Sequence, residues 1–123
     1  MDELLEGDLT YRIRGCVFEV YRQMGAGFLE QVYEKALCLE LQNHGLHATS
    51  QAPLIVNYKG VCVGEYRVDI LVEESVILEI KAQAQLRPEH EAQLLNYLKA
   101  SGKPVGLLVN FSYPKADVKR LVL

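Results

Sequence analysis

The sequence of 123 residues lacks several features that would assign it to particular classes of protein. No apolar run approaches the roughly 20 residues that a membrane-spanning helix needs. Residues 1–6 are acidic where a signal peptide would be basic, so we expect a cytoplasmic protein without a membrane partner. Half of the residues are hydrophobic and 24% are charged, which is typical of a globular chain. We therefore expect one domain over residues 1–123.

Cysteine is scarce, with three residues at Cys16, Cys38 and Cys62. Their number is odd, their spacing is wide, and each lies in apolar sequence. These features favour buried free thiols over a disulfide framework or a zinc site.

The sequence also lacks an excess of basic residues. Thirteen Lys and Arg residues face sixteen Asp and Glu residues, which gives a formal net charge of −3. A nucleic-acid-binding protein usually has a basic face, so this charge offers no support for such a function. It does not exclude one, because carboxylates gathered in a metal site would account for the acidic excess.

The segment from Arg67 to Lys81 does contain an unusual pattern of charge. Residues 68–72 and 76–80 are apolar and predict two strands, joined by the polar residues 73–75. Asp69, Glu79 and Lys81 interrupt these strands, although carboxylates are poor strand formers and are costly to bury. A divalent cation is the partner that best suits two carboxylates in this setting.

The loop length decides whether the two carboxylates can meet. Side chains alternate between the faces of a strand, so Glu79 and Lys81 share one face. A three-residue loop over residues 73–75 places Asp69 directly opposite Glu79, where side chains lie about 5 Å apart. A two-residue turn would send the two carboxylates to opposite faces, so the metal site requires a loop of odd length.

The rest of the sequence predicts a mixture of helices and strands. Three-four spacing of apolar residues predicts helices over residues 9–24, 29–43 and 88–100. Strands are expected within residues 46–56, 61–72, 76–81 and 104–111, and residues 113–123 form either a short helix or an edge strand. The order is helix, helix, three strands, helix, strand.

This order, with Asp69 on one strand and Glu79-Ile80-Lys81 on the next, resembles the PD-(D/E)xK nuclease superfamily. The resemblance implies a restriction-endonuclease-like α/β fold. Its αβββαβ core has a mixed central sheet flanked by helices, and here an extra helix precedes it. Val68 stands where the superfamily name has proline, at a position that varies among such nucleases.

Two further motifs narrow the resemblance. The segment Gly27-Phe28-Leu29-Glu30-Gln31-Val32-Tyr33 is similar to the signature of the GxxExxY family, a group of small prokaryotic proteins within the superfamily. Gln93 and Tyr97, on the helix after Glu-x-Lys, match the QxxxY motif of RecB-type nucleases.

The resemblance also implies roles for individual residues. Asp69, Glu79 and the Ile80 carbonyl would bind Mg²⁺ or Mn²⁺, and Lys81 would orient or help to deprotonate the attacking water. Glu30 would be an additional catalytic and metal-binding carboxylate. The side chains expected to contact the substrate are Gln93, Tyr97 and Tyr33.

Each role has a structural alternative. Asp69, Glu79 and Lys81 could form a cross-strand salt bridge on a solvated face of the sheet. Glu30 could be an exposed helix acid that pairs with Lys35. Tyr33 and Tyr97 could be core aromatics with hydrated hydroxyls. Gln93 could simply bond to backbone, and His90 could cap the start of its helix.

The function implied by the resemblance is hydrolysis of phosphodiester bonds by a divalent-metal-dependent nuclease, with DNA as the expected substrate. Because a domain of this size offers little surface outside the cleft, we expect a homodimer or a protein partner. Two alternatives remain open. The chain could be a non-catalytic nucleic-acid-binding module with the same fold, or a structural or regulatory protein that acts through a protein partner.

Overall fold

A computed structural model describes residues 6–123, which form three helices and five strands. Residues 1–5, on which the expectation about a signal peptide rests, lie outside the described part. No helix within residues 6–123 is long and apolar enough to cross a membrane. The elements in chain order are α1 (Gly7–Met24), α2 (Glu30–Asn43), β1 (Ala48–Tyr58), β2 (Val61–Val72), β3 (Val76–Lys81), α3 (Pro88–Ser101), β4 (Val105–Phe111) and β5 (Ala116–Leu121).

The five strands form one mixed sheet in the order β1-β2-β3-β4-β5. Strands β3 and β4 are parallel, and the other neighbouring pairs are antiparallel. The helix α3 connects β3 to β4, as a parallel crossover requires. The C-terminal segment, for which the sequence allowed a helix or a strand, forms the edge strand β5. The predicted order of helices and strands is therefore confirmed.

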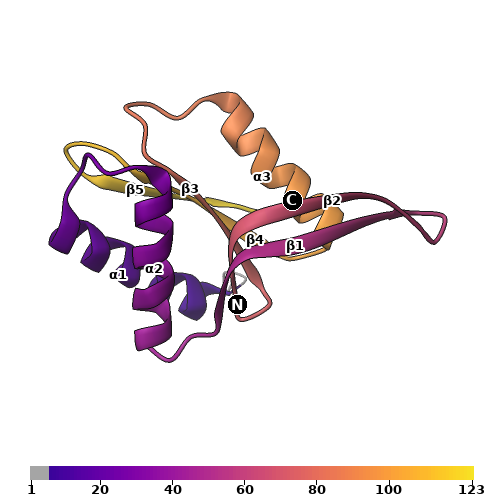
Figure 1. Cartoon of the computed structure of the whole chain (residues 1–123), viewed down its shortest axis with the longest axis horizontal. Coiled ribbons are helices and arrows are strands. Elements are labelled where there is room, and N and C mark those ends of the chain that lie inside the picture. The colour runs from indigo at the N-terminus through magenta and orange to yellow at the C-terminus, as the bar shows by residue number, and fades with distance from the viewer. Residues whose placement is uncertain (1–5) are drawn as a thin grey trace, which may run out of the picture.

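The helices cover both faces of the sheet (Figure 1). Val76, Leu78 and Ile80 of β3 pack in one core with residues of α1 and α2. Ile77 packs on the other face in a second core, with Leu94 of α3. Because side chains alternate along a strand, Glu79 and Lys81 share the face of Ile77 and are directed to the side of α3.

Strands β1 and β2 form a long hairpin whose tip extends beyond the helices (Figure 1). Several large apolar side chains near the tip are exposed, among them Tyr58, Val61 and Val63. Cys62 lies in this part of β2 and is exposed, whereas Cys16 and Cys38 are buried, and all three thiols are free. The prediction that Cys62 is buried was wrong, because apolar sequence beyond the end of the core has nothing to pack against.

Helix α3 is held close to the sheet at Gly106 of β4. A Cβ atom at this position would lie 2.8 Å from Cδ1 of Leu94, closer than side chains pack, so a larger residue would force Leu94 or α3 to shift. The start of α3 is capped by His90, whose Nδ1 accepts the backbone N–H of Arg87 at 3.0 Å. The capping role left open for His90 is therefore confirmed.

Candidate metal centre and nuclease site

The loop between β2 and β3 has the odd length that the metal site requires. It contains three residues, because Val72 pairs directly with Val76. Glu73 and Glu74 adopt left-handed backbone conformations, with φ of 52° and 55°. The side chain of Glu73 accepts the backbone N–H of His47 at 2.6 Å, which ties the loop to the segment before β1.

The β2–β3 ladder ends at Ile70 and Leu78, and the carboxylates of the next residue pair replace its hydrogen bonds. The backbone N–H of Asp69 donates to Oε2 of Glu79 at 2.9 Å. In the opposite direction, the backbone N–H of Ile80 donates to Oδ2 of Asp69 at 2.8 Å. The two strands therefore separate at this point, and a carboxylate from each strand lies in the space between them.

A local break in β1 lies directly across from Asp69. The β1–β2 register runs through Ser50↔Ile70 and Ala52↔Val68, but the intervening pair of Gln51 with Asp69 is missing. Gln51 has a φ of 54°, which is unfavourable for a residue with a side chain. Strained backbone of this kind persists only where the surroundings enforce it, and it is concentrated at functional sites. Here it frees Asp69 from the ladder on that side.

Burial shifts the pKa values of the two carboxyls upward. Glu79 is 5% exposed, and desolvation followed by the charge of Asp69 raises its pKa to about 8. Desolvation also raises the pKa of Asp69, against the opposing effect of its bond from the Ile80 backbone. Two carboxyls that resist ionisation together create a site in which a cation would be strongly stabilised.

Lys81 supplies positive charge to this site without a short ion pair. Its charge acts to lower the pKa of both Asp69 and Glu79. Among the ion pairs of residues 6–123, however, none joins Lys81 to either carboxylate. The alternative of a cross-strand salt bridge therefore does not describe the arrangement of these three residues.

Gln93 and Tyr97 of α3 contact each other beside the carboxylate pair. Nε2 of Gln93 donates to the Tyr97 hydroxyl at 3.0 Å. Desolvation and then the charge of Glu79 raise the pKa of Tyr97, which places this phenol within electrostatic reach of the site. Its ring also lies 5.3 Å from that of Tyr66 on β2, which is 39% exposed. The sequence pattern does not single out Tyr66.

Tyr33 has a structural environment. It is fully buried, and its ring stacks on Phe111 at a centroid distance of 4.3 Å. Its hydroxyl donates to the carbonyl of Gly25 and accepts the backbone N–H of Phe28, which fixes the turn between α1 and α2. These contacts favour the alternative of a core aromatic over the predicted contact with substrate.

Glu30 lies in the first turn of α2, where it lines a shallow pocket of about 330 Å³ together with Phe28 and Ala82. Ala82 directly follows Lys81, so Glu30 is near the end of β3. The charges that shift the pKa values of Asp69 and Glu79 do not include that of Glu30. Thus the structure brings Glu30 to the border of the site, and it does not place this residue with the carboxylate pair.

The acid that does influence the pair is Glu34, one helical turn after Glu30. Its charge raises the pKa of both Asp69 and Glu79. Glu34 accepts hydrogen bonds from Ser50 Oγ at 2.7 Å and from Gln51 Nε2 at 3.0 Å, so the strained residue of β1 holds this carboxylate. Its i, i+4 relation to Glu30 was the one sequence signal that could have indicated it.

The carboxylate pair offers oxygen donors of the kind that a divalent cation prefers. Each carboxylate of the pair accepts a backbone hydrogen bond through one oxygen, and the Asp69 carboxyl also interacts with the carboxyl of Glu34. Nowhere in residues 6–123 do three His, Cys, Asp or Glu side chains gather closely enough to hold an ion by themselves. Mg²⁺ is usually held by one or two carboxylates and keeps several waters, so the residues present fit an ion of this kind.

The fold and the carboxylate pair together define a nuclease-like α/β protein. Residues 7–121 match the PD-(D/E)XK nuclease superfamily, and the chain belongs to that superfamily. No curated protein matches the sequence.

Several solved structures resemble the chain, among them SSO0001 and an alkaline exonuclease. The crystal structure of SSO0001 is 20% identical with a TM-score of 0.58, over 75% of this chain and 48% of that one. An alkaline exonuclease, LHK-Exo from Laribacter hongkongensis, is 15% identical with a TM-score of 0.49, over 86% and 75% of the two chains. The likeness to SSO0001 shows the restriction-endonuclease-like fold. The chain spans about half the length of SSO0001.

Proposed function

We propose that this chain is a divalent-metal-dependent nuclease that hydrolyses phosphodiester bonds in DNA. The observation that carries the proposal is the exchange of hydrogen bonds between Asp69 and Glu79 where the β2–β3 ladder ends. Such an exchange orients two partly desolvated carboxylates into one space. Within the superfamily we assign the chain to the GxxExxY group, because Glu30 and Tyr33 carry its motif.

Mg²⁺ or Mn²⁺ is the cofactor that we propose for this site. Asp69, Glu79 and the carbonyl of Ile80 would hold it. The N–H and C=O of one strand residue point to the same side, and the N–H of Ile80 points to Asp69. The Ile80 carbonyl therefore faces the same space as the carboxylates. When bound, the cation lowers the pKa of water and polarises the phosphoryl oxygen.

Lys81 is the residue that we propose to act on the reacting groups. It lies two residues after Glu79 and therefore on the same face of β3. Because its ammonium is not tied to either carboxylate, it is available to orient the attacking water and to offset charge that develops on the phosphate.

Gln93 and Tyr97 would contact a phosphate or a base of the substrate. Glu30 would take part from the start of α2, as the superfamily resemblance implies. Glu34 is the acid whose charge reaches the pair, so it is the stronger candidate for the additional carboxylate.

The proposal is tested with purified protein, Mn²⁺ and a panel of nicked, single-stranded and duplex DNA, with RNA as a further substrate. Asp69→Asn and Lys81→Ala should each lower cleavage on the order of 100-fold or more, because each removes a group that acts on the transition state. The control is Asp117→Asn, which changes an exposed carboxylate on β5 that pairs with Lys115. Cleavage that persists unchanged in both site variants would contradict the proposal.

A second candidate is a non-catalytic nucleic-acid-binding or protein-interaction module with the nuclease fold. It is favoured by the absence, within residues 6–123, of a third acid close enough to complete a metal cluster. Mn²⁺ binding by calorimetry together with DNA binding and no turnover would support this module. A wild-type chain that cleaves DNA only when Asp69 and Lys81 are intact would exclude it.

A further inference from the structure

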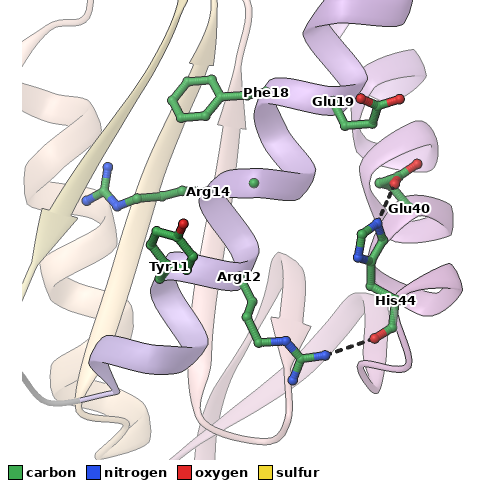
Figure 2. A pocket seen from close by; sticks show the side chains of 8 residues that line it. Tyr11, Arg12, Arg14, Phe18, Glu19, Glu40 and His44 are labelled. Carbon is green, nitrogen blue, oxygen red and sulfur yellow. Dashed lines mark hydrogen bonds and ion pairs between the residues drawn. The ribbon is translucent and has the colours of Figure 1, made fainter.

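The outer face of α1 carries two exposed aromatic side chains on either side of a glycine. Tyr11 is 77% exposed and Phe18 is 50% exposed, and Gly15 lies between them on the same face of the helix. The three residues line a cavity of about 660 Å³ between α1 and α2 (Figure 2). Because α1 and α3 pack on opposite faces of the sheet, this cavity is separate from the carboxylate pair.

The structure of a single copy of the chain does not explain why position 15 is glycine. It lies inside the 18-residue helix α1, where glycine costs about 1 kcal/mol relative to alanine. A Cβ atom at this position would meet no atom within 4 Å, so packing inside the monomer does not require glycine. What glycine does provide is close access for another backbone to the centre of an exposed helix face.

The same face carries charges of opposite sign at its two ends. Asp8 lies in the first turn and Arg22 in the last turn, and both are exposed. Asp8 forms no ion pair with any other residue in 6–123. Closer to the centre, Arg12 and Glu19 lie on the other flank of Gly15 from the aromatic pair, as Figure 2 shows for Glu19 and Phe18.

From this pattern we infer that α1 is a homodimer interface, in which two α1 helices pack antiparallel around a two-fold axis at Gly15. Asp8 and Arg22 both lie seven residues from Gly15, so Asp8 of one copy would lie opposite Arg22 of the other. Tyr11 lies four residues before Gly15 and Phe18 three residues after it, so these rings would also meet across the axis.

The two-fold symmetry places each flank of α1 beside the same flank of the second α1. A two-fold axis of this orientation brings the aromatic flank of one copy beside the aromatic flank of the other. On the opposite flank, Arg12 lies three residues before Gly15 and Glu19 four residues after it, so a cation would face an anion. A parallel arrangement would instead set Asp8 against Asp8 and Arg22 against Arg22, and would align the two helix dipoles unfavourably.

The charged residues already have contacts within the monomer, and these are compatible with the dimer. Arg22 pairs with Glu19 at 2.8 Å, yet its side chain remains 68% exposed. Nη2 of Arg12 donates to the carbonyl of His44 at 2.9 Å (Figure 2). A guanidinium has five N–H donors, so each arginine retains donors for a carboxylate of the second copy.

Sedimentation velocity of the full chain over a range of concentrations tests the inference. The wild-type protein should form a concentration-dependent dimer, and Gly15→Arg should be monomeric, because its side chain would fill the point of closest approach. The fold should survive this change, since the position is open in the monomer, and circular dichroism checks that it does. A wild-type chain that stays monomeric, or a dimer that folded Gly15→Arg leaves intact, would overturn the inference.

Charge reversal tests the antiparallel register. Arg22→Glu and Asp8→Lys should each weaken the dimer roughly tenfold, because the symmetry repeats every exposed pair twice. The two changes combined should restore the affinity, whereas Lys99→Glu on α3 should have no effect. Failure of the combined variant to recover, with both single variants weakened, would contradict this register. Lys81→Ala should dimerise like the wild type, so this test does not depend on nuclease activity.

Discussion

Glu79 links the site to the stability of the fold, because its buried carboxyl has a strongly raised pKa. Its side chain is buried beside Asp69, and its pKa is raised to about 8 from an ordinary value of 4.5. A carboxyl in this state disfavours its own ionisation unless a cation is near. Metal binding and proton release should therefore be linked at this residue.

The free energy of unfolding of the metal-free protein should fall as pH rises from about 4.5 to about 8. In this window the folded protein holds a proton on Glu79 that the unfolded chain releases, so raising the pH favours unfolding. The total change should be a few kcal/mol, at about 1.4 kcal/mol per pKa unit. Chemical denaturation at several pH values measures it.

Glu79→Gln provides the control for this pH dependence, because an amide keeps the size of the side chain and does not titrate. Its unfolding free energy should vary less over the same window and should exceed that of the wild type above pH 8. Equal pH slopes in the two proteins would show that Glu79 is ionised in the fold. Added Mn²⁺ should stabilise the wild type increasingly as pH rises, because cation and proton compete for the same carboxylates.

At the scale of the elements, the β2–β3 hairpin sets the position of the carboxylates. Its loop includes two glutamates with left-handed backbone, and Glu74 is exposed without a hydrogen bond or ion pair in the described structure. Glu74→Gly should raise the free energy of unfolding by about 0.5–1 kcal/mol, because glycine adopts this conformation without strain. Thermal unfolding measures the change.

Ser75→Gly is the matched control in the same loop, since Ser75 is not among the residues with positive φ. This change should destabilise the protein, because glycine there adds only freedom to the unfolded chain. If Glu74→Gly destabilises the protein as much as Ser75→Gly, the loop conformation described above is contradicted.

The packing of α3 on β4 determines where Gln93 and Tyr97 lie. Gly106→Ala would place a methyl group 2.8 Å from Leu94, which is fully buried, so the Leu94 side chain or α3 itself must shift. We expect a loss of about 1–3 kcal/mol in the free energy of unfolding, as overpacking usually causes. Chemical denaturation measures it.

Leu94→Ala in the Gly106→Ala background offers the complementary test. Removing the obstructing atoms should make the two changes less costly together than the sum of their separate effects. Additive costs would mean that Gly106 and Leu94 do not press on each other. A shift of α3 should also weaken substrate binding, because this helix carries the Gln93–Tyr97 pair.

At the scale of the whole molecule, the order of elements and the hairpin register followed from local patterns. Alternating apolar residues and the odd loop length placed Asp69 opposite Glu79 without reference to any distant contact. Such patterns depend on neighbours in sequence, and for this reason they are readable in a single chain.

The features that sequence could not supply depend on distant contacts. Glu34 reaches the site through Ser50 and Gln51 of β1, and the break at Gln51 has no signature in residue type. Tyr33 is occupied by Gly25 and Phe111, which only the packed structure brings together. The homodimer and the single domain over residues 1–123 stay predictions.

A crystal structure grown with Mn²⁺ and recorded with anomalous scattering would test the metal site between Asp69 and Glu79. We expect a single strong anomalous peak there, within coordination distance of both carboxylates and of the Ile80 carbonyl, and its loss in Asp69→Asn. No peak at this position under saturating Mn²⁺, or a Lys81 ammonium bridging the two carboxylates in its place, would show that the pair does not bind the cation.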